Sequence, residues 1–255
     1  MTDSGVYGKV RDMPVLGQVQ DRWWPAINGH VEALLGMEGL NPFAAEMIRY
    51  QVASGGKRVR PALVLIATRG LGGDPEAALP FSASVELIHN ASLVHDDIQD
   101  RDTTRRGRPS AWVAFSTEQA INLGDLLFVL GFEAMSRMPV PDGVKLEVIG
   151  LTIRAIGELV DGQVYEFILK DRDMVSVDEY YSLVSGKTGS LFRLACAGGA
   201  ALAGAPPGTA REMRSVGEDL GAMFQIRDDL LDVVGHKEGR PVISYFIRSS
   251  RIRNS

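Results

Sequence analysis

ASLVHDDIQD, residues 91–100, and AMFQIRDDLLDVV, residues 222–234, contain the same spacing of aspartates, DDxxD, within apolar segments. Apolar residues also recur at intervals of three and four, as at Leu87, Ile88 and Ala91. This is the period of a helix that packs one face against a core. Because the spacing recurs along the chain and strand-like alternation is scarce, the sequence predicts an all-α fold.

Turns rich in Gly and Pro separate the predicted helices. They are GLNP at 39–42, SGG at 54–56, GLGGDP at 70–75, MPVPDG at 138–143 and GAPPG at 204–208. None of them resembles a linker between domains, so we expect one domain.

Composition excludes several classes of protein. The 45% apolar and 23% charged residues argue against disorder, and the net charge of 27 − 32 = −5 gives no overall reason to bind nucleic acid. Cys196 has no second thiol, so a reducing cytoplasm is expected. The start of the chain does not resemble a secretory signal, and the longest uncharged apolar stretch, residues 194–205, is too short to predict a membrane span.

The two aspartate clusters predict a metal site. They consist of Asp96, Asp97 and Asp100 in the first copy and Asp228, Asp229 and Asp232 in the second. Residues three or four apart share a helix face, so we expect the carboxylates of each copy to converge. Aspartate oxygens without His or Cys suit Mg²⁺, which keeps several waters and bridges to phosphate. Two facing clusters would hold a diphosphate between them.

A solvated acidic face is the alternative interpretation of one DDxxD, and a satisfied buried network is another. The second copy weakens the first of these interpretations, whereas the buried network stays open beside the cationic groups described next. Each copy lies in an apolar helix, where an aspartate pair would be costly unless it lined a polar cavity.

Three cationic motifs and a histidine complement the carboxylates. The motifs are GGKRVRP at 55–61, RRG at 105–107 and GKTGS at 186–190, and His89 lies two helical turns before Asp96. Taken singly, these would be a helix cap, a surface turn, a loop and a structural histidine. GKTGS lacks the earlier Gly and the preceding strand of a phosphate-binding P-loop, so we reject that interpretation.

Together these motifs resemble the trans-type isoprenyl diphosphate synthases, or polyprenyl synthetases. The shared segments, in family order, are GGKRVRP, ELIHNASLVHDDIQD, RRGRPS, INLGDLLF, DGQVYEF, GKTGSLF and FQIRDDLLD. The resemblance implies an isoprenoid synthase-type helical bundle around a central cavity, usually a homodimer. It also implies a Mg²⁺-dependent transferase that joins isopentenyl diphosphate to an allylic diphosphate.

The resemblance also implies a role for each matching residue. All six aspartates of the clusters, Asp232 included, would bind Mg²⁺, and Arg105 would assist at the allylic diphosphate. The isopentenyl diphosphate would be held by Lys57, Arg60, His89 and Arg106, and the reacting centre would be lined by Lys187, Thr188 and Gln225. Gln163 matches the family motif GQxxD, but Glu166 stands where the family has Asp.

Two small residues before the first cluster bear on product length. Ala91 and Ser92 lie five and four positions before Asp96 and would leave the cavity open there. In the family, that pattern suggests geranylgeranyl diphosphate or a longer product.

The C-terminal part departs from the family pattern. We expect one synthase-like domain over residues 1–240, without the family's closing helices, and a divergent tail over 241–255. A truncated or frame-shifted product and a natural partial homologue are both open explanations. Two other functions therefore stay open beside the prenyltransferase: a class I terpene synthase, and a weak or silent partner subunit.

Overall fold

Helices form nearly all of the described chain. This computed structural model describes residues 14–36, 39–172 and 174–234. The elements in chain order are α1 (Pro14–Leu35), α2 (Pro42–Val52), α3 (Val59–Gly70), α4 (Leu79–Gln99), β1 (Thr104–Arg105), β2 (Arg108–Pro109), α5 (Ala111–Ala114), α6 (Thr117–Ser136), α7 (Asp142–Lys170), α8 (Val177–Val184), the π-helical turn η2 (Ser185–Gly189), α9 (Ser190–Leu202) and α10 (Pro207–Val234). The predicted all-α class is confirmed.

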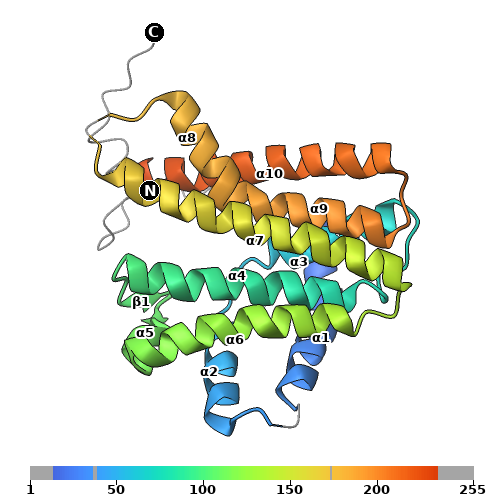
Figure 1. Ribbon diagram of the computed structural model, residues 1–255, viewed down its shortest axis with the longest axis horizontal. Coiled ribbons are helices and arrows are strands. Elements are labelled where there is room, and N and C mark those ends of the chain that lie inside the picture. The colour runs from blue at the N-terminus through green and yellow to red at the C-terminus, as the bar shows by residue number, and fades with distance from the viewer. Residues whose placement is uncertain (1–13, 37–38, 173, 235–255) are drawn as a thin grey trace, which may run out of the picture.

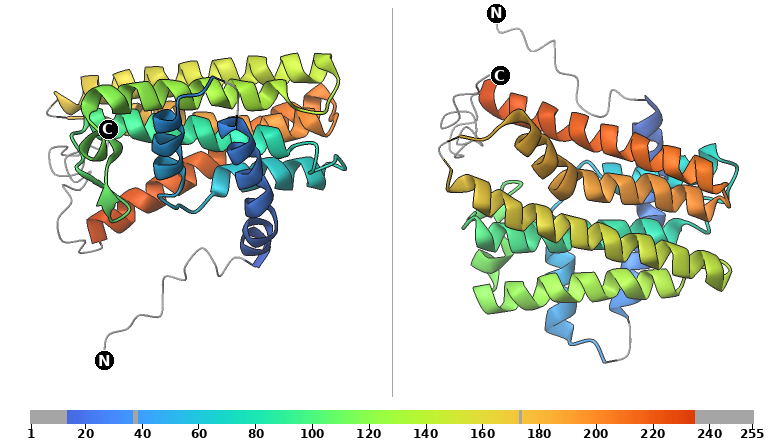
Figure 2. Two further views of the ribbon diagram at one scale, coloured as in Figure 1. Left: turned by 90° about the horizontal axis from the view of Figure 1, so that it is seen from below. Right: turned by 45° about the horizontal axis from the view of Figure 1, so that its top comes forward.

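The long helices form a bundle. In Figure 1, α4, α6, α7, α9 and α10 run along the length of the molecule, and α1 and α2 cross this set. Figure 2 shows the same arrangement from two other directions. The predicted turns lie between helices. The predicted tail, 241–255, lies outside the described residues.

The core lies largely around α4. Leu87, Ile88, Ala91 and Val94 of this helix are fully buried, as their spacing predicts, and α4 packs extensively against α6. Complete burial of one Leu or Ile side chain contributes about 1.5–3 kcal/mol. This packing fixes the rotation of α4 and therefore decides which of its polar residues face away from the core.

Helix α9 occupies the centre of the other half of the bundle. Its residues from Ser190 to Ala201 are all buried, and it contacts α3, α7 and α10. Its many Ala and Gly residues allow these neighbours to approach closely. Because η2 leads directly into α9, the side chains of η2 begin from a firmly packed helix.

A short hairpin that the sequence analysis did not predict joins α4 to α5. Thr104 pairs with Pro109 and Arg105 with Arg108 in antiparallel register. Arg106 and Gly107, between the strands, have φ angles of 53° and 78°. Positive φ at both central residues is typical of a type I′ turn. In the described part of the chain, no helix is both long and apolar enough to cross a membrane.

Candidate functional site

A cavity of about 670 Å³ opens between α4 on one side and η2, α9 and α10 on the other. The loop before α3 and the hairpin complete its wall. The structure brings these predicted residues together around it: Lys57, Arg60, His89, Ser92, Asp96, Arg105, Arg106, Lys187, Thr188, Gln225 and Asp228. Leu93, Leu159, Leu191 and Phe224 supply the apolar part of the lining.

The two adjacent aspartates of the first cluster have different surroundings. Asp96 lines the cavity, but Asp97 is only 1% exposed and accepts a 2.7 Å hydrogen bond at Oδ1 from Arg105 Nε. Successive helix residues point about 100° apart, so adjacent aspartates face different directions. Across the described residues, no three His, Cys, Asp or Glu side chains form a group that could hold a metal by itself.

Asp100 also lies outside the lining of the cavity. It caps the C-terminal end of α4, and its Oδ1 lies 2.7 Å from Lys170 Nζ. In the second cluster, Asp228 lines the cavity and Asp229 does not. The side chain of Asp232 is outside the described residues.

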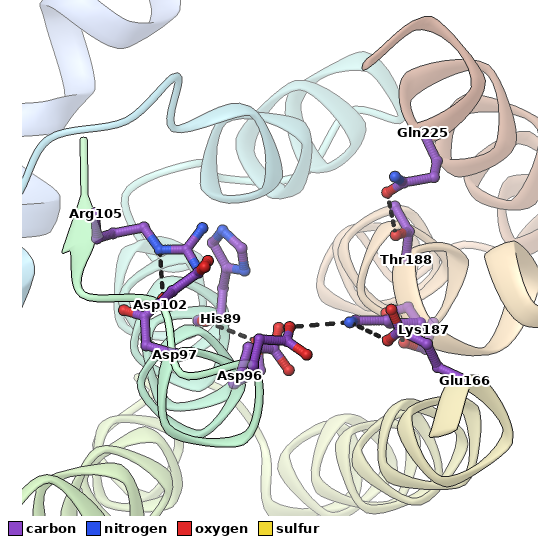
Figure 3. Close-up of polar contacts among 12 residues, drawn as sticks. His89, Asp96, Asp97, Asp102, Arg105, Glu166, Lys187, Thr188 and Gln225 are labelled. Carbon is purple, nitrogen blue, oxygen red and sulfur yellow. Dashed lines mark hydrogen bonds and ion pairs between the residues drawn. The ribbon is translucent and has the colours of Figure 1, made fainter. Parts of the chain in front are cut away.

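Asp229 instead accepts hydrogen bonds from Tyr180 and Gln225. Tyr180 OH donates to its Oδ2 at 2.5 Å, and Gln225 Nε2 donates to its Oδ1 at 2.8 Å. Thr188 Oγ1 in turn donates to Gln225 Oε1 at 2.7 Å (Figure 3). Burial and the contact with Asp229 raise the pKa of Tyr180. Asp229 therefore orients Gln225 and Thr188, and the sequence analysis missed Tyr180.

Lys187 joins the two sides of the cavity. Its ammonium pairs with Glu166 and lies 3.9 Å from Asp96 Oδ2 (Figure 3). Glu166 stands where the family has Asp, and it supplies the carboxylate that pairs with Lys187 at the site. Burial and the nearby carboxylates of Glu166 and Asp100 raise the pKa of Asp96 to about 6, although Lys187 opposes this shift.

A close helix crossing positions Lys187. A Cβ atom on Gly162 of α7 would lie 2.5 Å from the backbone nitrogen of Lys187 and 2.8 Å from the carbonyl carbon of Gly186. No larger residue fits at Gly162 unless one backbone moves. The glycine in the DGQVYEF motif therefore sets the distance between α7 and η2.

The cationic side of the cavity is built on the loop before α3. Lys57 Nζ lies 3.4 Å from Asp228 Oδ1. The Arg60 guanidinium lies 4.7 Å from the centre of the Phe192 ring, and its Nη1 lies 3.3 Å from His89 Nε2. Burial and the neighbouring Arg60 lower the pKa of His89 well below its usual value. A neutral His89 can therefore accept a hydrogen bond from Arg60.

The hairpin closes over this loop. Arg106 donates to the carbonyl oxygen of Gly55, and Gly56 has a φ of 131°. A Cβ atom on Gly56 would lie 2.7 Å from the Arg106 guanidinium nitrogens. Arg105, on the same hairpin, holds Asp97 and lines the cavity. The hairpin therefore positions Arg105 and Arg106 in the wall of the cavity.

A buried ion pair that the sequence analysis did not assign supports the loop. Glu86 is 2% exposed, pairs with Arg58 and accepts a 2.8 Å hydrogen bond from Asn90 Nδ2. Arg58 adopts a left-handed conformation with φ of 47° and stacks 4.1 Å from the centre of the Trp24 ring. A glutamate within the apolar run before the first cluster was the signal available in the sequence.

Of the two predicted chain-length residues, one lines the cavity. Ser92 does so, whereas Ala91 is fully buried and belongs to the hydrophobic core. The packing of α4 against its neighbours turns Ala91 into the core, and its effect on product length stays a prediction.

The polyprenyl synthetase family model matches residues 41–242, a span that includes every element of the cavity. The chain belongs to the polyprenyl synthetase family. A relative named (2E,6E)-farnesyl diphosphate synthase, from Mycobacterium tuberculosis, is 37% identical over 91% of this chain and 63% of its own length. The geranylgeranyl diphosphate synthase of Methanosarcina mazei is 36% identical over 74% of this chain and 59% of its own length.

Solved structures agree with this assignment. The geranylgeranyl pyrophosphate synthetase of Pyrococcus horikoshii superposes with a TM-score of 0.85 and 34% identity, covering 95% of this chain and 74% of that one. The predicted isoprenoid synthase-type bundle is therefore confirmed. The chain spans about three fifths of the length of the first curated relatives it matches.

The residues that line the cavity fit a divalent metal. Asp96 and Asp228 come from different helices and line one cavity, so their oxygens are available to a shared ligand. The raised pKa of Asp96 reflects burial and crowding of carboxylates, which a cation would relieve. Mg²⁺ takes few protein carboxylates and completes its shell with water and phosphate oxygens, so a group of three is not required.

Proposed function

We propose that this member of the polyprenyl synthetase family is a Mg²⁺-dependent prenyltransferase. It would join isopentenyl diphosphate head-to-tail to an allylic diphosphate and make geranylgeranyl diphosphate or a longer product. One observation carries the proposal: carboxylates and cations from distant segments line the same cavity, and the rest of its wall is apolar. The names of the relatives, farnesyl and geranylgeranyl diphosphate synthases, support this reaction class.

The cationic side suits the diphosphate of isopentenyl diphosphate. Lys57, Arg60 and Arg106 would bind its oxygens, and arginine is well shaped for two-point contact with phosphate. His89 would keep Arg60 in place through the 3.3 Å contact between their ring and guanidinium nitrogens.

The carboxylate side suits the allylic diphosphate. Asp96 and Asp228 would hold the metal, with Asp100 joining them once it is released from Lys170. Asp97 and Asp229 would position Arg105 and Gln225. Bound Mg²⁺ would neutralise the diphosphate and so favour its departure.

Three further residues would stabilise the reacting centre. Lys187, Thr188 and Gln225 would surround the reacting groups. The oxygens of Thr188 and Gln225 would face the positive charge that develops on the carbon chain, because oriented dipoles stabilise charge strongly when water is excluded, and the Lys187 ammonium would face the departing diphosphate. Leu159, Leu191 and Phe224 would exclude water from the allylic cation. The double bond of isopentenyl diphosphate would attack the allylic cation, and the new cation would then lose a proton to the departed diphosphate. No side chain would need to act as a covalent nucleophile.

The two alternative functions make different demands on the site. A terpene synthase would not need the cationic side, so the assembly of Lys57, Arg60 and His89 around the cavity favours the prenyltransferase. A silent subunit would have no need for Asp96 and Asp228 in one cavity.

The experiment that tests the proposal compares sets of substrates. The full chain is incubated with Mg²⁺ and an allylic diphosphate, with and without isopentenyl diphosphate, and the products are separated by chain length. Elongated diphosphates that require both substrates are expected. A hydrocarbon formed from the allylic diphosphate alone would identify a terpene synthase, and binding without turnover would identify a silent subunit.

Ser92→Phe should shorten the product. Ser92 lines the cavity, and a phenyl ring there would block a growing chain within about one helical turn, roughly 5.4 Å. Product chromatography measures the effect. Ala91→Phe should instead destabilise the core by about 1–3 kcal/mol through overpacking. An unchanged product profile for Ser92→Phe would show that the growing chain does not pass Ser92.

Tyr180→Phe should raise the KM for the allylic diphosphate about fivefold or more, because it removes a hydrogen bond to a charged group and loosens Asp229. Tyr181→Phe is the matched control, since the adjacent Tyr181 is 50% exposed. Steady-state kinetics with each diphosphate varied in turn separate the two variants. Equal kinetics for both would show that Tyr180 does not position Asp229.

A homodimer would cover an exposed apolar stripe on α7. Leu146, Ile153, Val160 and Phe167 recur every seven residues and are 37–69% exposed. We expect Val160→Asp to yield monomers in sedimentation velocity, whereas Val177→Asp on α8 should leave the dimer intact. Monomeric wild-type protein would contradict this proposal.

The cytoplasmic location expected from the single cysteine stays a prediction.

A further inference from the structure

Five charged side chains of alternating sign form a chain between α4 and the α7–η2 side of the cavity. In order they are Asp100, Lys170, Glu166, Lys187 and Asp96. Lys170 Nζ lies 2.7 Å from Asp100 Oδ1 and 3.5 Å from Glu166 Oε1. Lys187 pairs with Glu166 and lies 3.9 Å from Asp96 Oδ2 (Figure 3).

The two lysines of this chain neutralise part of the charge of Asp96, Asp100 and Glu166. Three carboxylates face two ammonium groups, so the local charge is −3 + 2 = −1 rather than −3. Each of Asp96 and Asp100 already has an ammonium within 4 Å. A divalent cation that entered here would meet both positive charges.

The two lysines differ in their setting. Lys187 lies within η2 and lines the cavity. Lys170 is the last residue of α7, has a side chain 34% exposed, and is not part of the lining. Its flexible four-carbon stem can swing toward solvent, away from Asp100, Glu166 and the Phe167 ring, whose centre lies 4.7 Å from Lys170 Nζ. Lys170 is therefore the member of the chain that can leave most readily.

We propose that Lys170 is a resident counter-cation of the first aspartate cluster, occupying Asp100 in the metal-free protein and weakening metal binding there. This inference rests on the proposed metal-dependent function. Metal entry at Asp100 would require Lys170 Nζ to withdraw. The released ammonium would then be free to meet the negative charge of the incoming diphosphate, so metal and diphosphate would favour each other's binding.

Metal affinity of the full chain tests this inference without reliance on turnover. Mn²⁺, which electron paramagnetic resonance detects in its free form, replaces Mg²⁺ in a titration without substrate. Lys170→Gln should bind Mn²⁺ about fivefold more tightly than wild type, since a partly exposed ion pair contributes up to about 1 kcal/mol. Lys170→Arg keeps the charge and should stay within about twofold of wild type.

Lys145→Gln is the matched control. Lys145 also lies on α7, but near its other end, where it donates to the carbonyl oxygen of Ser136 at 3.0 Å. Its loss changes the net charge equally and should leave the Mn²⁺ affinity unchanged. A gain in Lys145→Gln equal to that in Lys170→Gln would overturn the inference, because net charge alone would then explain both.

An Asp96→Ala titration separates this inference from the proposed function. If Asp96→Ala weakens Mn²⁺ binding but Lys170→Gln matches wild type, the role of Lys170 is refuted and the metal site stands. If Asp96→Ala has no effect, the metal assignment fails and the inference fails with it. Weaker binding by Lys170→Gln would also overturn it, because Lys170 would then organise the cluster rather than compete with metal.

Discussion

Asp96→Ala is expected to lower kcat/KM by about 10³-fold or more, equivalent to about 4 kcal/mol of transition-state stabilisation. Asp96 is the carboxylate of the first cluster that lines the cavity, and it lies within 3.9 Å of Lys187 on the opposite side. Its loss removes a proposed metal ligand from the allylic diphosphate subsite. Initial rates at saturating Mg²⁺ measure the effect.

The same variant should not unfold. The pKa of Asp96 is raised from 3.8 to about 6 in the folded protein, so folding opposes its ionisation. That penalty is absent below about pH 4, grows as pH rises, and is complete above about pH 6. Removing the carboxylate should therefore favour stability more at pH 8 than at pH 4, as thermal melts at both values would measure.

Asp125→Ala provides the control for activity. Asp125 is an acid on α6 whose side chain is 68% exposed, and it does not line the main cavity. Its replacement should leave kcat/KM within about twofold of wild type, as expected for an exposed site away from the chemistry. Retained Mg²⁺-dependent turnover in Asp96→Ala would overturn the metal assignment.

Gly162→Ala is expected to reduce activity about 10²-fold and the free energy of unfolding by about 1–2 kcal/mol. The new Cβ would lie 2.5 Å from the backbone nitrogen of Lys187, so α7 and η2 must separate. Separation moves Lys187 and Thr188 away from Asp96 and Gln225. Overpacking of this kind outweighs the helix propensity that Ala gains over Gly, about 1 kcal/mol.

Gly157→Ala changes only helix propensity, so it is the control for the packing effect of Gly162→Ala. Gly157 is on the same helix, and a Cβ atom there would meet nothing within 4 Å. This variant should match or exceed wild-type stability and keep its activity. Chemical denaturation and initial rates, measured for both variants, test the pair. If Gly162→Ala behaved like Gly157→Ala, the crossing would not position Lys187.

Much of the fold could be predicted from local patterns. The three- and four-residue spacing of apolar residues identifies α4, and the Gly- and Pro-rich segments mark the turns. The hairpin at 104–109 escaped prediction because each strand has only two residues. Its turn depends on positive φ at Arg106, which the residue type does not suggest.

The motifs identify most residues of the site, but they do not show which of these residues face the cavity and which hold a neighbour in place. Motif spacing places adjacent aspartates together, but tertiary packing fixes the rotation of α4 and α10, and so decides that Asp96 and Asp228 face the cavity. Tyr180 and Lys170 act on partners 49 and 70 positions away in the chain. Local periodicity contains no signal for contacts at such separations.

Incorporation of labelled isopentenyl diphosphate tests the central claim most directly. The full chain is given the labelled substrate, an unlabelled allylic diphosphate and Mg²⁺, and label is counted in the acid-labile allylic product. The account predicts incorporation that requires both the allylic diphosphate and Mg²⁺. Absence of incorporation, while both diphosphates bind, would contradict the claim that this cavity joins them.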